Sequence, residues 1–432
     1  MKEEHLCCID GLNANSAQER LSSLKMLKAA VDAGEIERPE PGNDVNNHIH
    51  TIYSFSPYSP SKAIWMAYQA GLKTAGIMDH DTISGAREFI KAGKILGVAT
   101  TIGVECRADF SDTPLRGKRL NNPDQVSNAY IAFHGIPHQK ISDVEKFLRP
   151  YLDERIKRNI LMVNKINETI KPFGITLDFE VDVKSLSMYA EGGSITERHI
   201  LFAFSKKLVN KFGKGRRLVG FLKNSLELDL NPRIEKYLLD ESNIYYEYDL
   251  LGALKSDMVK MFYIDARSEC PGVREAIAFC REIGAISAYA YLGDVGDSVT
   301  GDKKAQKFED DYLDLLFEVL KSLGFNAVTY MPSRNTTAQL KRVKALCEKH
   351  GLFQISGEDI NSPRQPFVCP AMRDKEFADL IDSTWALVGH ERAATENIAN
   401  AMFSDEMIKK YPNLNERIKI YRELGMKSAV KA

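Results

Sequence analysis

The sequence predicts an α/β fold: a closed or nearly closed barrel that carries a mostly helical insertion and flanking helices. Strand-like and helix-like segments alternate along much of the chain, a pattern typical of parallel strands joined by right-handed crossovers. Seven strand-like segments fit a barrel better than an open sheet. A stretch from about residue 140 to residue 283 breaks the alternation and predicts the insertion.

The barrel elements follow from periodicity and from helix start and stop signals. A helix over 15–33 and a polar, proline-rich linker precede the first strand. Strands are expected near 45–50, 74–78, 100–105, 128–134, 284–290, 325–330 and 352–356. Helices are expected over 60–71, 84–97, 271–283, 310–323 and 337–350.

The insertion and the tail are expected to be helical. Residues 141–170 predict one long helix, or two joined near Pro150, and the spacing of Ser194 and Glu197 predicts a capping box for a helix ending near Phe212. The basic segment 211–224 is expected to be a loop, and the tail is expected to hold two or three helices broken near Pro412. The chain therefore divides into a helical extension and linker (1–43), the barrel with its insertion (44–365) and a C-terminal helical extension (366–432).

Composition favours an ordinary globular protein, with 44% hydrophobic and 27% charged residues. A net charge of −1 provides no global attraction to nucleic acid or to an anionic membrane. No apolar run has the length of a membrane helix, and the N-terminus lacks the apolar centre of a signal peptide. Seven cysteines without a C-x-x-C pair indicate a reduced, cytoplasmic protein, whereas the oligomeric state is not indicated.

Metal-ligand residue types end or follow the predicted strands. Two histidines one residue apart on a strand point the same way, and parallel barrels assemble their sites at the carboxyl ends of the strands. Each residue alone is more simply a core or surface residue, but imidazole and carboxylate together suit Zn, Mn or Fe. The set that predicts a metal site is His48, His50, His80, Glu105, His134 and Asp359.

These residues resemble the motifs of the polymerase and histidinol phosphatase (PHP) superfamily, which opens with H-x-H and continues with D-H, G-x-E and a further His. The resemblance covers about residues 44–365 and is more specific in its first half. It implies a distorted (β/α)7 TIM-like barrel with two or three divalent metals, whose bound hydroxide attacks a phosphoester. It also implies a first metal held by His48, His50, Glu105 and Asp359, a second reached by Glu105 and His134, and a third served by His80.

The chain departs from the family pattern at three places. Tyr289 stands where the family usually has the histidine of Ala-His-Pro, Asn361 replaces the last histidine of D-x-H, and no ligand follows H-x-H over residues 51–56. One or two ions of Mn, Fe or Zn are therefore expected. Tyr289, Asn361 and His138 are candidates to replace the lost ligands, although His138 is equally well a loop histidine.

Arg198 and His199 lie in the first turn of a predicted helix, where the helix dipole favours an anion. The resemblance implies that this pair belongs to the site, as catalytic or phosphate-binding residues; the alternative for His199 is an exposed capping-turn histidine. Arg334, after the sixth strand, is a second phosphate-binding candidate. The basic run of Lys211, Lys214, Arg216 and Arg217 is more simply a solvated loop than a cover over an anionic substrate.

Two functions remain open. The first is a metal-dependent phosphoesterase for a small phosphorylated molecule, nucleotide or short oligonucleotide, with nucleic acid given little support by the near-neutral charge. The second is a degenerate barrel that binds metal or ligand without catalysis, in a sensory or scaffolding role. The departures at Tyr289 and Asn361 favour the second. The first is favoured by the intact set of His48, His50, Glu105, His134 and Asp359.

Overall fold

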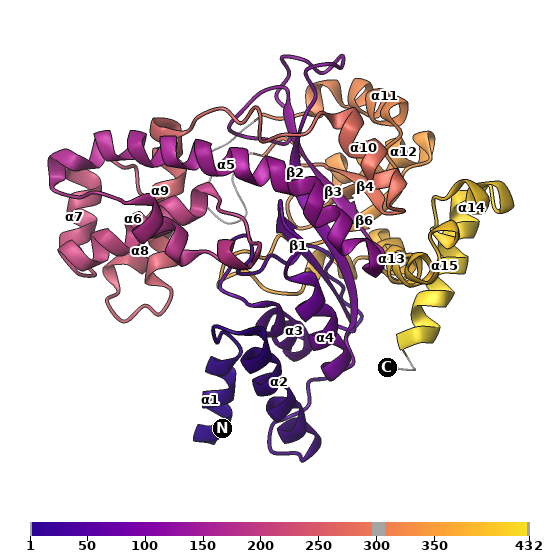
Figure 1. Ribbon diagram of the computed structural model, residues 1–432, viewed down its shortest axis with the longest axis horizontal. Coiled ribbons are helices and arrows are strands. Elements are labelled where there is room, and N and C mark those ends of the chain that lie inside the picture. Colours follow the sequence, from indigo (N-terminus) through magenta and orange to yellow (C-terminus); the bar gives the residue numbers. More distant parts are fainter. Residues whose placement is uncertain (1, 296–306, 430–432) are drawn as a thin grey trace.

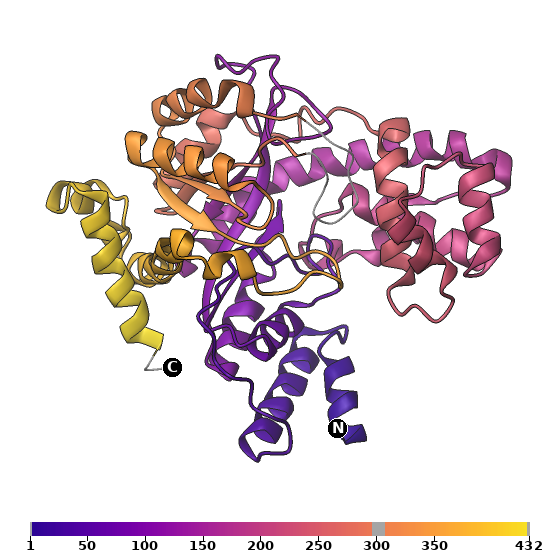
Figure 2. The same cartoon turned by 180° about the vertical axis from the view of Figure 1, so that it is seen from behind.

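A computed structural model describes residues 2–295 and 307–429, and it has a central curled sheet with helices packed around it (Figure 1). The helical insertion forms a lobe on one side of the sheet, and the C-terminal helices lie on the opposite side (Figures 1 and 2). The sheet contains six strands in sequence order. They are β1 (Thr74–His80), β2 (Ala99–Asp109), β3 (Asn128–His134), β4 (Ile286–Ala290), β5 (Ala327–Tyr330) and β6 (Phe353–Ser356).

The predicted barrel helices are all present. In the first half they are α3 (Pro60–Gln69) and α4 (Ala86–Leu96). The helix expected over 15–33 in the N-terminal extension is α2 (Ala17–Asp32), and it is preceded by a short α1 (Glu3–Gly11) that the sequence pattern did not predict. In the second half they are α10 (Val273–Glu282), α11 (Leu313–Leu323) and α12 (Thr337–His350). The tail contains α13 (Ala378–Glu396), α14 (Asp405–Lys410) and α15 (Leu414–Ala429), with the predicted break at Pro412 between the last two.

The prediction of an all-parallel sheet is wrong at β3, which runs antiparallel to both β2 and β4. Residues 110–127 join β2 to β3 without a helix. A parallel pair needs a crossover, usually helical, whereas an antiparallel pair needs only a loop. The carboxyl end of β3 therefore lies at the opposite end of the sheet from the carboxyl ends of its neighbours.

The first predicted strand, 45–50, is not a continuous strand. Only Ile49 forms bridges, one to Ile77 of β1 and one to Ile360 after β6, both parallel. Residues 46–50 thus lie between the two edges of the curled sheet.

The insertion contains α5 (Ile141–Ile170), α6 (Glu197–Phe212), α7 (Arg216–Asn224), α8 (Pro232–Leu239) and α9 (Tyr246–Phe262). α5 is a single helix that continues through Pro150. The predicted loop 211–224 is wrong, since α7 occupies most of it and buries Leu218, Val219 and Leu222 in a core that belongs to the insertion. The capping box is also shifted by two residues, because Thr196 and His199 form it instead of Ser194 and Glu197.

α13 packs against the concave side of the sheet, where three of the inward-facing strand residues are alanines. Ala132, Ala288 and Ala327 share a buried cluster with Ala386 and Leu387 of α13. Small residues on the strands leave room for this helix to pack close to the sheet. Among the described residues, no helix combines the length and the apolar character needed to cross a membrane.

Candidate metal centre

Backbone contacts on both sides hold the segment that carries His48 and His50. Ile49 N donates to Gly76 O at 2.9 Å, and His50 N donates to Ile360 O at 3.0 Å. Glycines allow this close approach: a Cβ at Gly76 would lie 2.8 Å from Asn47 Cα, and a Cβ at Gly357 would lie 2.7 Å from His48 Cβ. The glycines therefore fix the depth at which the two histidines enter the site.

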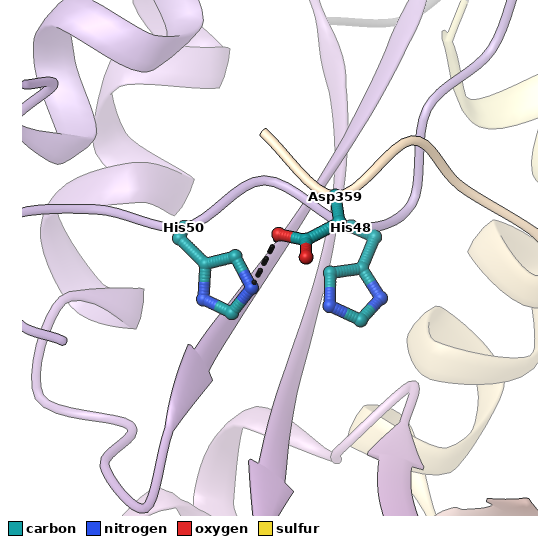
Figure 3. A group of neighbouring side chains, drawn as sticks. All are labelled: His48, His50 and Asp359. Atoms are coloured by element: carbon teal, nitrogen blue, oxygen red, sulfur yellow. Dashed lines mark ion pairs between the residues drawn. The ribbon is translucent and has the colours of Figure 1, made fainter. Parts of the chain in front are cut away.

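Two overlapping groups of side chains have the donor atoms of a metal centre. His48, His50 and Asp359 form one group, and His50, His80 and Glu105 form the other, each with ligand atoms within 4.8 Å of one another. Figure 3 shows both histidines of the first group pointing the same way, with Asp359 entering from another segment. His50 Nε2 lies 3.1 Å from Asp359 Oδ1, and His80 Nδ1 lies 3.1 Å from Glu105 Oε2.

Buried nitrogens without hydrogen bonds show that these residues fit a cation. His50 Nε2 and His80 Nδ1 are buried and face carboxylate oxygens at 3.1 Å without the geometry of a hydrogen bond. His134 Nε2, outside both groups, is also buried without a hydrogen bond. Burial lowers the pKa of His80 and of His134 to about 3, so both rings are neutral near pH 7. A neutral imidazole with an unused lone pair is the form that binds a metal ion.

His50 is oriented by a buried carboxylate behind it. Its Nδ1 lies 3.3 Å from Ser54 Oγ, and Ser54 Oγ donates to Asp79 at 2.6 Å. Asp79 also accepts 2.6 Å hydrogen bonds from the backbone N and the hydroxyl of Thr51. Such outer contacts set the ring angle and tautomer of a ligating histidine. The segment after H-x-H therefore supplies orienting hydroxyls rather than a further acidic or histidine ligand.

Asn361 acts next to Asp359, where its amide Nδ2 donates to Asp359 Oδ1 at 2.5 Å. The asparagine thus orients a predicted ligand.

His134 faces the concave side of the sheet, since its partner on β4 is Ile286 of the inner cluster. Among the described residues it belongs to neither metal-binding group.

Two of the suggested replacement ligands do not face the centre. Tyr289 is fully buried in the outer core, and its hydroxyl contacts Asn121 N and Glu309. The inward-facing residues of β4 are instead Ile286, Ala288 and Ala290, of which Ala290 lines the cavity. His138 pairs with Glu391 of α13 at 2.9 Å. The structure brings neither residue to the metal-binding groups, because alternation along β4 and the reversed direction of β3 carry them away from the centre.

Two cavities open beside the metal-binding groups, with volumes of about 180 and 410 Å³. The smaller contains His48, His80, Glu105 and Asp359, and the larger shares Arg198 and Asp359 with it. Arg334 lines only the larger one, where its Nε donates to Leu292 O at 3.2 Å. Both predicted phosphate-binding arginines therefore line a cavity: Arg198 lines both, and Arg334 lines the larger one.

His199 is buried in the first turn of α6. Its Nδ1 accepts a 3.0 Å hydrogen bond from Thr196 N, and its ring packs edge-on against Phe55. Burial lowers its pKa to about 3. His199 is thus a capping-turn histidine, as the alternative expected, but it is buried rather than exposed, and its ring lines neither of the two cavities.

The sequence pattern missed a buried group of ion pairs beside the centre, which we name the arginine–carboxylate cluster. Its members are Asp81, Arg107, Arg155, Arg158, Glu197 and Glu269. Arg107 was within reach of prediction, since it is two residues after Glu105 on β2 and so faces the same side. No local signal shows that α5 brings Arg155 and Arg158 back to this strand.

A curled α/β sheet gathers histidines and carboxylates at an arginine-lined cavity, which defines the class as an α/β protein with a candidate metal centre. The PHP domain family model matches residues 46–324, and the chain belongs to that family.

Solved structures show the same fold. One is a provisionally assigned metal-dependent phosphoesterase from Bifidobacterium adolescentis, with 18% identity, a TM-score of 0.52, and coverage of 81% of this chain and 98% of the other. A second is an amidohydrolase from Chromobacterium violaceum with bound sulfate and no metal, with 15% identity, a TM-score of 0.50, and coverage of 78% and 96%. A search of curated proteins found no match.

Proposed function

We propose that this protein is a phosphoesterase that acts on a small phosphorylated molecule, a nucleotide or a short oligonucleotide. The observation that carries the proposal is the position of Arg198, which lines the same cavity as His48, His80, Glu105 and Asp359. A guanidinium beside a metal centre suits a phosphoryl group, because its fork donates to two oxygens at once. The larger cavity adds Arg334 on the side where the rest of the substrate would lie.

We infer that the centre holds one or two divalent ions of Mn, Fe or Zn. His48, His50 and Asp359 would hold the first, and Glu105 with His80 would hold the second. A bound divalent ion supplies an acidified water and polarises a phosphoryl oxygen. The protein contributes by fixing the ligands: Asn361 holds Asp359, Asp79 orients His50 through Ser54, and burial keeps His80 neutral.

We also infer that residues 46–50 close the curled sheet as an irregular seventh strand, giving the (β/α)7 barrel of the family. Their hydrogen bonds to Gly76 on one side and to Ile360 on the other support this closure. The seven free cysteines support a cytoplasmic location, since disulfides are rare there.

The proposal is tested with purified protein loaded separately with Mn, Fe and Zn. Metal content is measured by mass spectrometry, and hydrolysis is measured on p-nitrophenyl phosphate, bis-p-nitrophenyl phosphate and a nucleotide panel. Activity that is lost in His48→Ala, with the fold retained by circular dichroism, supports the proposal. Metal-loaded protein that hydrolyses none of these substrates refutes it.

A second candidate is a barrel that binds metal without catalysis. The inward-facing Ala290 on β4 favours it, because this position carries no donor for a second ion. It predicts one tightly bound ion and no turnover. Robust hydrolysis that Glu105→Gln abolishes would exclude it.

A further inference from the structure

The arginine–carboxylate cluster joins the insertion to the sheet next to the metal-binding groups. Arg107 comes from β2, Asp81 follows β1, Arg155 and Arg158 come from α5, and Glu197 is the first residue of α6. Its three arginines and three carboxylates balance in charge. All but Glu197 are almost fully buried, and Glu197 has a side-chain exposure of 17%. Buried charges of this kind hold their geometry tightly, because losing one member leaves the charge of its partner buried and unpaired.

Glu197 is the member that connects the cluster to α6. Its Oε1 accepts from Arg107 Nη2 at 2.8 Å and from Arg158 Nη2 at 2.6 Å. One arginine belongs to the sheet and the other to the insertion, so this single carboxylate ties the start of α6 to both. Glu269 receives the same two arginines from the other side, through Arg107 Nη1 at 3.2 Å and Arg158 Nη2 at 2.9 Å.

Arg198 is the next residue after Glu197, and it lines both cavities. The first turn of α6 is held on one side by the two ion pairs of Glu197. On the other side it is held by the capping box of Thr196 and His199. Arg198 lies between these two attachments, and it lines the smaller cavity together with Asp359, a predicted metal ligand. The place of the Arg198 guanidinium over the centre is therefore set by its neighbours in the chain.

We propose that Glu197 is a positioning residue for the phosphoryl group: through Arg107 and Arg158 it fixes Arg198 at the metal-side end of the cavity. The inference rests on the proposed function for its ligand, since it assumes that Arg198 binds a phosphoryl oxygen. Loss of the Glu197 charge frees the first turn of α6. Arg198 then binds phosphate from a broader range of positions, and so more weakly.

The test is a double-mutant cycle on the metal-loaded full chain, with the affinity for inorganic phosphate measured by isothermal titration calorimetry. Arg198→Ala is expected to lower this affinity roughly 10- to 100-fold, the value of a charged hydrogen bond. Glu197→Gln is also expected to lower the affinity for phosphate. The double variant is expected to bind phosphate no more weakly than Arg198→Ala alone, because Glu197 acts through Arg198. For any phosphoester that the wild type hydrolyses, Glu197→Gln is expected to raise KM more than it lowers kcat.

Asp182→Asn is the matched control. Asp182 also has a side-chain exposure of 17%, and it pairs at 2.9 Å with Lys207 of α6, away from the cavities. It should leave phosphate affinity unchanged. Glu197→Asp, which keeps the charge on a shorter side chain, provides a second variant if Glu197→Gln does not fold, and its loss of affinity should also disappear in an Arg198→Ala background.

The outcomes separate the two proposals. Losses that add in the double variant, or a Glu197→Gln protein that binds phosphate like the wild type, overturn the positioning role and leave the phosphoesterase proposal intact. If the losses of phosphate affinity do not add in the double variant, but the protein hydrolyses no phosphoester, the positioning role is supported and the phosphoesterase proposal is refuted.

Discussion

Gly357→Ala is predicted to damage the metal centre through the backbone. The added Cβ would lie 2.7 Å from His48 Cβ, 2.8 Å from His48 N and 3.1 Å from Asn47 C. Ordinary contacts of this kind begin near 3.4 Å, so the 46–50 segment must move by about 0.7 Å. Overpacking of this size costs about 1–3 kcal/mol of stability. The displacement also exceeds the roughly 0.2 Å tolerance of metal–ligand distances.

Two measurements test this prediction: thermal unfolding and metal affinity from competition with a chelator. For a chain of 432 residues, we expect the Tm to fall by roughly 1 °C for each kcal/mol lost and the metal affinity to fall at least about tenfold. Gly220→Ala in α7 is the control, since an added Cβ would have no other atom within 4 Å. This substitution should raise the free energy of unfolding by about 0.5–1 kcal/mol, because alanine has a higher helix propensity than glycine. A Gly357→Ala protein with wild-type stability and metal affinity would refute the reasoning that this glycine fixes the depth of His48.

Three further predictions concern residues behind the centre and the C-terminal helices. Asp79→Asn should lower metal affinity about 10- to 100-fold by releasing the contacts that orient His50, checked by the same chelator competition. Burial lowers the pKa of His390 to about 4, and its Nδ1 accepts from Met402 N. The unfolded histidine has a pKa near 6.5, so the free energy of unfolding of the wild type should fall by up to about 3 kcal/mol as pH falls from 6.5 to 4. In urea unfolding, His390→Asn should not show this part of the pH dependence. Gly389→Ala would place a Cβ 1.9 Å from a backbone oxygen of α15, and its Tm should fall by more than that of Gly357→Ala; an unchanged Tm would contradict the tight packing of α13 on α15.

Much of the fold could be predicted because its signals are local. The capping box of Ser16, the Ser59-Pro60 helix start and the glycine after α12 set helix limits through hydrogen bonds within a few residues. The direction of β3 was missed because it depends on the connections at its two ends. Helix α7 was missed because its sequence is mostly basic and its apolar face is short. That face is recognised only from its contacts with the core of the insertion.

Some residues of the candidate centre could also be predicted from local signals, and others could not. His48, His50, His80, Glu105 and Asp359 were predicted because each ends or follows a strand-like run, and the structure brings them together. Tyr289 and His138 were misplaced because a residue count cannot give the face or the direction of a strand. Tyr289 faces the outer core, and His138 lies beside α13.

The sequence by itself determined the donor atoms of the centre and the helices and strands that carry most of them, because ligand chemistry and local periodicity are properties of neighbouring residues. Only the tertiary structure decided what surrounds those donors. Gly76 and Gly357 enclose the H-x-H segment from elements far apart in the chain, and α5 brings its arginines to Glu197 across a long sequence distance. Such contacts depend on how the chain returns to the sheet, and no local pattern encodes that path.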